Sequence, residues 1–520
     1  MREYNVILKK NVDYDGFWND IESDTDGGKL YIPNRRVEFT NERPTSLRQC
    51  WYLLTDEEAE QLKLDDRVYD VEIPPEHRTD IEIEKKAIQT GDFTKTTSDS
   101  GTYINWGLIR CNSLTNIYGS SNSTTSSYNY TLTGDGVDVV IQDSGLQVDH
   151  PEFNDENGNS RVQQMDWFAA SGVSGTQSVN HYRDNDGHGT HVASTAAGLT
   201  YGWAKKARIY SQKLAGLETQ SGTDGTGISI SLAFDCIKGW HNNKTNDPQT
   251  GVKRPTVVNM SWGYSTGIGT VSSVTYRGST FSSPSDSTLA NSYGLIGATS
   301  FSRRANVRIS SVDTDIQEMI DAGIIVCIAA GNGSHKIDVV GGTDYNNSFN
   351  NGSTVFYHRG FSPYDDEAII VGNVDSTVYS ATQDQKATSS EAGPGVTIYA
   401  PGTNIMGACS TTNAFADEPY YLNSSYRQMN ISGTSMATPQ VAGVCALMLE
   451  VNPRMTPSQI RTALLANAGT ALYDTGVNND WTDNRSLKGG TVKFLYNKFN
   501  SEKTFSVSNI TFSGIGFKIR

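Results

Sequence analysis

The sequence predicts an α/β protein with a mainly parallel sheet, preceded by a small α+β domain and followed by a β-rich tail. Three largely apolar stretches, residues 137–142, 257–260 and 324–330, have the composition of buried strands. Each ends in a turn that contains glycine, and the first ends at Asp143. In open α/β sheets, ligands bind in the crevice beyond the carboxyl ends of the strands. We therefore expect Asp143 to point into such a crevice.

Four elements are expected in the small N-terminal domain. Residues 4–9 and the alternating residues 66–72 have the pattern of strands. Residues 14–21 are predicted to form a short helix. A second helix is expected to begin after Thr55, which forms a capping-box pattern with Glu58.

The composition divides the chain into four parts. A segment that is first charged and then rich in Thr, Ser, Asp and Gly is typical of an exposed, protease-accessible linker. Near the C-terminus, residues 492–499 and stretches within 505–519 alternate like strands, which would cover a sheet edge or dock onto a partner. The predicted parts are the small domain over 1–77, the linker over 78–104, the α/β domain over 105–483 and the tail over 484–520.

The overall composition argues against some classes of function. The 520 residues carry a formal net charge of −15, which argues against nucleic acid as a partner. No apolar run approaches the about 18 residues of a membrane-spanning helix. The first residues lack the apolar segment of a secretory signal, so cytoplasmic synthesis is expected and the final location is left open. The six cysteines are scattered and form no C-x-x-C motif, so reduced thiols are expected.

A serine at position 435 stands directly before a predicted apolar helix. Residues 431–439 place Ser435 between Gly-Thr and Met-Ala-Thr-Pro, and an apolar run follows over 441–449. A helix N-terminus offers partial positive charge and unpaired N–H groups to an anion that forms beside it. We expect Pro439 in the first turns of this helix, where its missing N–H has no intrahelical partner in any case. Ser435 is therefore the candidate nucleophile, with a Ser/Gly-rich turn before a core helix as the alternative.

A serine nucleophile needs a base, and the base needs a partner that orients it. His188 and His191 lie where a Gly-rich segment becomes an Ala-rich helical stretch. Two histidines three apart share one helix face and could bind a metal, but no Cys or Glu stands at a matching spacing. No metal site is predicted here. His188, at the loop–helix junction, is the candidate base, His191 is expected to pack or bond locally, and Asp143 is the candidate orienting acid.

In the order Asp143, His188, Ser435, these blocks resemble the signature segments of the subtilisin-like serine proteases, the subtilase or peptidase S8 family. A fourth block, the apolar stretch that ends in Gly-Asn-Gly at Asn332, resembles the family's oxyanion segment. This implies that the Asn332 side-chain amide donates to the oxyanion of the tetrahedral intermediate. The resemblance covers roughly residues 105–470, and the connection after the histidine helix is similar to that of proteinase K.

Two further blocks resemble the backbone segments that align the substrate in this family. The block after the strand at 257–260 implies one wall of the S1 pocket, and the other implies the edge that holds the P2–P4 residues. The residues concerned are Ser261, Trp262 and Gly263 in the first block, and Gly225, Thr226 and Gly227 in the second.

The resemblance also implies a three-layer subtilisin-like domain that requires no cofactor. Many bacterial relatives bind calcium, but two of the usual positions do not support it here. The loop over 198–206 lacks the longer Asn-containing segment, and Thr397 stands where relatives often have a ligating Asp. Calcium needs several oxygen ligands, usually including carboxylates. The sequence therefore predicts no metal at these positions.

Residues 1–77 resemble the subtilase propeptide, an inhibitory α+β domain, which implies an intramolecular inhibitor and autocleavage within 74–104. The expected function is that of a serine endopeptidase that is made as a self-inhibited precursor and acts on polypeptides. The alternative, from another class, is a structural component of a virion or other assembly that keeps a subtilase scaffold and its propeptide. Such a component would meet its assembly partner through the tail.

Two long insertions interrupt the resemblance. Residues 264–310 and 334–361 are rich in Ser, Thr, Gly or Asn and show no clear internal structure. Loops of this length are usually functional or disordered. Both follow strands that border the expected cleft, so we expect them to rim it and restrict the substrates that enter, with a surface elaboration as the alternative.

Overall fold

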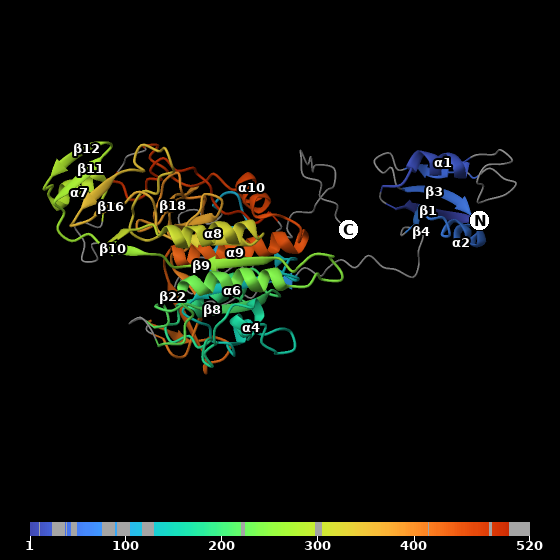
Figure 1. Ribbon diagram of the computed structural model, residues 1–520, viewed down its shortest axis with the longest axis horizontal. Coiled ribbons are helices and arrows are strands. Elements are labelled where there is room, and N and C mark those ends of the chain that lie inside the picture. The colour runs from blue at the N-terminus through green and yellow to red at the C-terminus, as the bar shows by residue number, and fades with distance from the viewer. Residues whose placement is uncertain are drawn as a thin grey trace. The chain divides into compact units, whose positions relative to one another are not determined.

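The computed structural model describes residues 1–9, 11–22, 37, 39–42, 49–74, 89–90, 105–116, 129–219, 224–296, 304–413, 415–477 and 481–498. The chain divides into two units, Met1–Lys86 and Ala87–Arg520 (Figure 1). Apart from β5 (Gln89–Thr90), which pairs with β6 (Asn129–Tyr130), the predicted linker lies outside the described residues. The strands expected within 505–519 lie outside them as well.

The smaller unit is an antiparallel sheet with two helices, and it contains all four elements expected from the sequence. The sheet order is β2-β3-β1-β4. Its core includes Val6 and Leu8 of β1 and Phe17 of α1. Helix α2 begins at the predicted capping box, in which Thr55 and Glu58 bond each other's backbone N–H. The elements are β1 (Arg2–Leu8), α1 (Tyr14–Glu22), β2 (Phe39–Glu42), β3 (Gln49–Leu54), α2 (Asp56–Leu62) and β4 (Val68–Glu72).

The larger unit is built on the mainly parallel sheet that the sequence predicts. Its strand order is β18-β17-β14-β9-β7-β8, with β19 also paired to β17, and only the β17–β18 pair is antiparallel. Every residue of β7, β9 and β14 is buried, so both faces of the sheet are covered. The strands are β7 (Asp138–Asp143), β8 (Arg208–Lys213), β9 (Thr256–Met260), β14 (Ile325–Ala329), β17 (Ile369–Ser380), β18 (Gln383–Lys386) and β19 (Ile398–Pro401).

Two pairs of helices cover this sheet and give the expected three layers. Helices α5 and α9 pack together, and α9 lies against β9, β14 and β17. Helices α6 and α8 form the other pair, with α8 against β14 and α4 against α6. The helices are α3 (Trp106–Arg110), α4 (Trp167–Ser171), α5 (His188–Ala197), α6 (Ile230–Asn243), α8 (Ser310–Asp321), α9 (Thr434–Val451) and α10 (Pro457–Asn467). A 3-10 turn (Pro151–Phe153) and a three-stranded sheet of β20 (Ile405–Cys409), β22 (Arg427–Ile431) and β21 (Glu418–Pro419) complete the scaffold.

The two insertions fold together, so the expectation that they lack internal structure is wrong. They share a sheet of order β12-β11-β15-β16, in which β11 comes from the first insertion and β15 from the second. A separate core forms beneath it from apolar residues that include Val274, Leu289 and Phe349. The elements of this insertion module are β10 (Ser265–Gly267), β11 (Ser273–Tyr276), β12 (Ser279–Ser282), α7 (Asp286–Tyr293), β13 (Arg304–Asn306), β15 (Ser348–Asn350) and β16 (Thr354–Phe356).

The module could not be predicted from the sequence because the strands are short and largely polar, and one central pair, β11–β15, joins the two insertions. Val274 and Phe349, for example, face each other across the β11–β15 pair. In Figure 1, α7, β11, β12 and β16 gather at one end of the larger unit, apart from α4 and β8.

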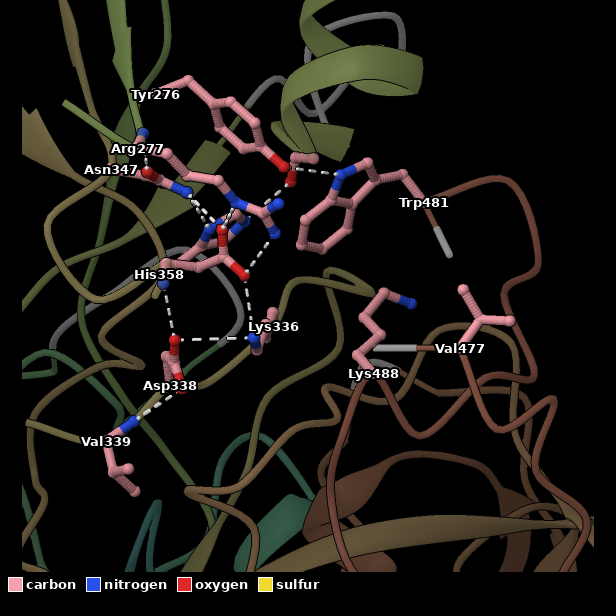
Figure 2. A network of polar contacts seen from close by, with 12 residues as sticks. Tyr276, Arg277, Lys336, Asp338, Val339, Asn347, His358, Val477, Trp481 and Lys488 are labelled. Atoms are coloured by element: carbon pink, nitrogen blue, oxygen red, sulfur yellow. Dashed lines mark hydrogen bonds and ion pairs between the residues drawn. The ribbon is translucent and has the colours of Figure 1, made fainter. Parts of the chain in front are cut away.

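A buried ion cluster fastens the tip of the module to the segment that follows β14. Arg277, in the β11–β12 turn, donates from Nε to Asp344 Oδ1 at 2.7 Å, and Lys336 Nζ donates to Oδ2 at 2.8 Å. Asn347 also donates to Asp344 Oδ1, at 3.0 Å (Figure 2). Burial alone would raise the pKa of Asp344, but Arg277 and Lys336 outweigh it and hold that pKa below its usual range.

The part of the predicted tail that the structure describes belongs to the larger unit, which corrects the boundary expected after residue 483. Leu487, Phe494 and Leu495 lie in the main hydrophobic core. Leu495 N donates to Tyr399 O at 2.8 Å. Over the described residues 491–498, Phe494 forms isolated bridges to Tyr399 and Gly469 in place of the strand expected over 492–499. The described helices include none that could cross a membrane.

Candidate active site

Asp143 and His188 meet at the carboxyl edge of the parallel sheet. Asp143 ends β7, and its Oδ1 accepts a hydrogen bond from His188 Nδ1 at 2.8 Å. Ser144 N donates to the same oxygen at 2.7 Å and fixes the carboxylate. His188 opens α5 directly after Gly187, whose φ of 100° turns the chain into the helix. Nδ1 is therefore the protonated ring nitrogen, and Nε2 is left to act as a base.

Three carboxylates act on His188. Burial opposes its protonation, but Asp143, Asp186 and Asp184 together raise the pKa of His188 to about 9. Asp186 also accepts a hydrogen bond from the His188 backbone N–H at 3.2 Å. The imidazolium that forms during proton transfer is thus stabilised by more than the Asp143 partner alone.

Ser435 lies level with His188 because the two helices that carry them pack together from the same edge of the sheet. Ala196 and Gly443 stand equally far along α5 and α9 from His188 and Ser435, and a Cβ on Gly443 would lie 2.8 Å from Ala196 O. The Ser435 hydroxyl donates to Ser261 O at 3.1 Å. Within the described residues, no hydrogen bond joins Ser435 to His188, and the hydroxyl is engaged by Ser261 O instead.

Asn332 presents its amide nitrogen beside Ser435. Asn332 Oδ1 accepts from Thr434 N at 2.9 Å and from Thr434 Oγ1 at 3.1 Å, which turns Nδ2 the other way. The position of a Cβ on Gly433 is 3.5 Å from Asn332 Nδ2 and 3.6 Å from Ser435 N. Two N–H donors thus lie near one point, which is what an oxyanion site requires, with Asn332 Oδ1 3.7 Å from the same point.

Pro439 lies beyond the first turn of α9, which corrects the expectation that its missing N–H costs nothing. An N–H at this position would bond Ser435 O, and a proline inside a helix costs about 3 kcal/mol or more. Here the Ser261 hydroxyl donates to Ser435 O at 2.9 Å and replaces that hydrogen bond. Asn259 Nδ2 in turn donates to Ser261 Oγ at 2.9 Å, which orients the hydroxyl.

The predicted S1 wall lies beside the nucleophile. Ser261 contacts Ser435 as described, and the Trp262 ring packs in a T-shaped contact with Tyr264. Phe361 occupies the space between Gly263 and Gly331, because a Cβ on either glycine would lie within 2.8 Å of its ring. Phe361, which the sequence did not identify, therefore packs against both of these glycines, just beyond the ends of β9 and β14.

The second predicted substrate block, Gly225–Thr226–Gly227, lies at the surface just before Ile228, which bridges to Leu214. Asp224 accepts from Thr226 N at 3.0 Å and from Lys213 Nζ at 2.7 Å. Lys213 is buried and directly opposite Asp143 in the β7–β8 register. Lys213, on β8 beside Asp143, thus links this strand to the predicted substrate block through its hydrogen bond to Asp224.

His191 is packed in the interior, as one of the two expectations had it, but its hydrogen bond is to a residue distant in the sequence, so the expectation of a local bond is wrong. Its Nε2 lies 2.9 Å from Ile405 O, and burial lowers the pKa of His191 to about 3, so the ring is neutral. Among the described residues, no group of three or more His, Cys, Asp or Glu side chains could hold a metal.

Two positions were considered for calcium from the sequence, and Lys205 and Thr397 lie there. Lys205 is buried, and its Nζ donates to Leu199 O and Gly202 O at 2.7 Å each. The Thr397 hydroxyl accepts from Ile370 N at 3.1 Å and donates to Ala368 O. An ammonium group and a hydroxyl thus bond backbone carbonyls at these two positions.

The chain is similar in sequence to known proteinases over about two thirds of its length. The Extracellular serine proteinase of Thermus sp. (strain Rt41A) is 28% identical over 338 residues, which are 65% of this chain and 56% of that protein. Subtilisin-like protease 5 of Arthroderma otae is 30% identical over 346 residues, which are 66% of this chain and 58% of that protein. This chain thus spans less than two thirds of either relative.

Two further likenesses extend over more of the chain. Proteinase R of Parengyodontium album is 27% identical over 398 residues, 76% of this chain and 70% of that protein. The crystal structure of a cold adapted subtilisin-like serine proteinase covers 76% of this chain and 98% of that chain, at 24% identity and a TM-score of 0.45.

The Subtilase family, Peptidase_S8, matches residues 134–496, which contain all of the site described above. The chain belongs to the Subtilase family.

Proposed function

We propose that this chain is a serine endopeptidase in which Ser435 is the nucleophile, His188 the base and Asp143 the residue that orients the base. The observation that carries the proposal is the 2.8 Å hydrogen bond between Asp143 and His188, at the start of a helix that packs level with Ser435. Polypeptides are the proposed substrates, since acyl transfer through such a triad cleaves peptide bonds.

The first step is proton transfer from the Ser435 hydroxyl to His188 Nε2 as the serine oxygen attacks the scissile carbonyl. For this the hydroxyl leaves Ser261 O, to which it donates in the resting state. Asp143 holds the ring with Nδ1 protonated and stabilises the imidazolium. His188 then returns the proton to the leaving amine, and water hydrolyses the acyl-enzyme by the same route.

The carbonyl oxygen becomes an oxyanion between two donors. Asn332 Nδ2 and the Ser435 backbone N–H both face the open position at Gly433. The amino end of α9 adds partial positive charge at the same place. Loss of one such side-chain donor costs about 10²–10³ in kcat in a subtilisin.

Two further features belong to the proposal. The unit Met1–Lys86 would act as an intramolecular inhibitor of propeptide type, supported by its antiparallel sheet with two helices. Cleavage within 74–104 would release it. The enzyme would need no calcium at the two usual positions, because Lys205 and Thr397 already bond the carbonyls there.

Labelling with a fluorophosphonate probe tests the proposal, with Ser435→Ala as the control and intact mass measured alongside. The expected result is labelling that depends on Ser435, together with loss of roughly the first 75–105 residues. The proposal would be contradicted if the purified chain stayed uncleaved and unlabelled, and if it also remained unlabelled after trypsin had cut the linker. That result would favour a structural component that keeps the subtilase scaffold.

A further inference from the structure

Glu391 forms hydrogen bonds to both ends of the turn that carries Asn332. We call these contacts of Glu391 with Gly331 and Gly333 the clamp. The Glu391 backbone N–H donates to Gly331 O at 3.0 Å. Its side-chain Oε1 accepts from Gly333 N at 3.1 Å. Asn332 is the residue between these two anchors, so both flanking peptide groups are fixed by one residue. We propose that Glu391 is the positioning residue for the oxyanion donor, an inference that rests on the proposed function.

The insertion module contributes to this clamp. Asn306, the last residue of β13, donates from Nδ2 to Glu391 Oε1 at 3.0 Å. The same Nδ2 lies 3.2 Å from the position of a Cβ on Gly331. Glu391 Oε1 therefore joins Asn306 of the module to Gly333 of the turn. The insertion is thus part of the support of the oxyanion site and more than a rim or a surface elaboration.

The side chains at the clamp are buried. Glu391 is 0% exposed and His335 is 1% exposed, with His335 Nδ1 3.7 Å from Glu391 Oε1. The segment that carries Glu391 runs beside the turn and the residues after it: Ser334 N donates to Ser389 O at 2.8 Å and Ile337 N to Ala392 O at 2.7 Å. A hydrogen bond in such surroundings is electrostatically stronger than the same bond in water.

The module is itself held in place close by. Lys336, on the same segment as Asn332, donates to Asp344, which Arg277 of the β11–β12 turn also binds (Figure 2). This cluster anchors the module, whereas Asn306 and Glu391 transmit its position to the turn. The two sets of contacts share no side chain.

The clamp matters because an oxyanion donor acts only when its position is accurate. Thr434 fixes the Asn332 side chain through Oδ1, and Glu391 fixes the backbone from which that side chain extends. A displacement of about 1 Å at a reacting group can cost about 10²-fold in rate. We expect Glu391→Ala to lower kcat by about 10- to 100-fold and to leave KM within about twofold, since Glu391 does not touch the substrate.

A double-mutant cycle with Asn332→Ala separates positioning from general damage. Turnover of a fluorogenic peptide is measured for the full chain, for Asn332→Ala, for Glu391→Ala and for the double variant. If Glu391 acts through Asn332, Glu391→Ala costs less than about twofold in the Asn332→Ala background. Multiplicative losses in the double variant would overturn the proposal.

Three companion variants keep the test decisive. Glu391→Gln keeps an oxygen acceptor of the same shape and should restore most of the activity, and it serves if Glu391→Ala does not fold. Asn306→Ala should lower kcat less than Glu391→Ala and should also lose its effect when Asn332 is absent. Glu152→Gln is the matched control, because Glu152 is an equally buried carboxylate that accepts from Thr200 N and Tyr201 N, away from the turn. Its effect on kcat should not depend on Asn332.

The failure of this inference is distinguishable from failure of the proposed function. A wild-type chain that neither turns over the peptide nor reacts with the fluorophosphonate contradicts the proposed function. An active wild type that loses activity with Asn332→Ala, and in which Glu391→Ala has no effect, contradicts only the role of Glu391.

Discussion

Ser261 and Ser435 exchange hydrogen bonds between the end of a strand and the start of a helix. The Ser435 hydroxyl donates to Ser261 O at 3.1 Å, and the Ser261 hydroxyl donates to Ser435 O at 2.9 Å. The second bond satisfies the carbonyl that Pro439 leaves without its helical N–H. A residue of the predicted substrate strand therefore holds the nucleophile in place.

Ser261→Ala should reduce both stability and activity. It leaves the Ser435 carbonyl without this hydrogen bond in the first turn of α9, and an unsatisfied buried acceptor costs about 1–3 kcal/mol. Urea unfolding of the Ser435→Ala background, which prevents autolysis, measures the stability change. Ser261→Thr keeps the hydroxyl and should retain most of the stability; an equal loss in both variants would show that the hydrogen bond is not the cause.

Gly433→Ala should lower activity strongly while the fold stays intact. Its Cβ would lie 3.5 Å from Asn332 Nδ2 and 3.6 Å from Ser435 N, which is ordinary contact distance, but it would stand where the oxyanion forms. We expect kcat to fall by about 10²–10³-fold, as when a donor is removed. The melting temperature should change little, since an extended glycine gains a methyl group without strain.

Gly267→Ala is the matched control, because its Cβ would meet nothing within 4 Å on the exposed strand β10. It should change neither the turnover nor the melting temperature. Wild-type turnover by Gly433→Ala would place the oxyanion elsewhere.

Activity should rise with pH into the alkaline range. His188 must be neutral to act as a base, and Asp143, Asp186 and Asp184 outweigh burial and raise its pKa to about 9. The pH profile of kcat/KM should therefore rise through about pH 9, since this ratio reports the pKa of the free enzyme. For stability the sign is opposite: the raised pKa stabilises the fold fully below about pH 6.5, and this contribution is lost as pH rises through about 9.

Asp186→Asn should shift that profile to lower pH, because it removes one of the three negative charges around His188. Asp235→Asn, an acid of α6 that does not act on His188, is the control and should leave the profile in place. An inflection at or below pH 6.5 in the wild type would mean that the carboxylates do not govern the base.

Removal of calcium should leave the fold unchanged at the two positions considered. Lys205 Nζ and the Thr397 hydroxyl already bond the backbone carbonyls there. We expect the melting temperature of Ser435→Ala to shift by less than about 1 °C when EGTA is added. A bound ion at 100 times its Kd would stabilise by about 2.7 kcal/mol, so a fall of several degrees on chelation would contradict the prediction.

The parts of the site that could be predicted from the sequence are those with a local signal. Asp143 ends an apolar strand, and His188 opens a helix after a Gly-rich turn. Ser435 precedes an apolar helix, and all three patterns occupy a few consecutive residues. The parallel sheet followed from continuous apolar strands, because strands buried on both faces carry no polar alternation.

The supporting residues could not be predicted, because their partners are distant in the sequence. Glu391 carries no motif, and its contacts with Gly333 and Asn306 exist only in the folded chain. The insertion module was not predicted for the same reason, since its strands β11 and β15 come from different insertions. Thr434 stood next to the candidate nucleophile, but only its bonds to Asn332 reveal its role.

The most direct test of the central claim is the cleavage of an unfolded protein such as casein, with the new chain ends identified by mass spectrometry. Wild-type protein, clipped in the linker if necessary, should produce cuts at internal peptide bonds, Asn332→Ala should cut about 10²–10³-fold more slowly, and Ser435→Ala should not cut. Cleavage that persists in Ser435→Ala, or a wild type that makes no internal cut, would contradict a serine endopeptidase built on Ser435.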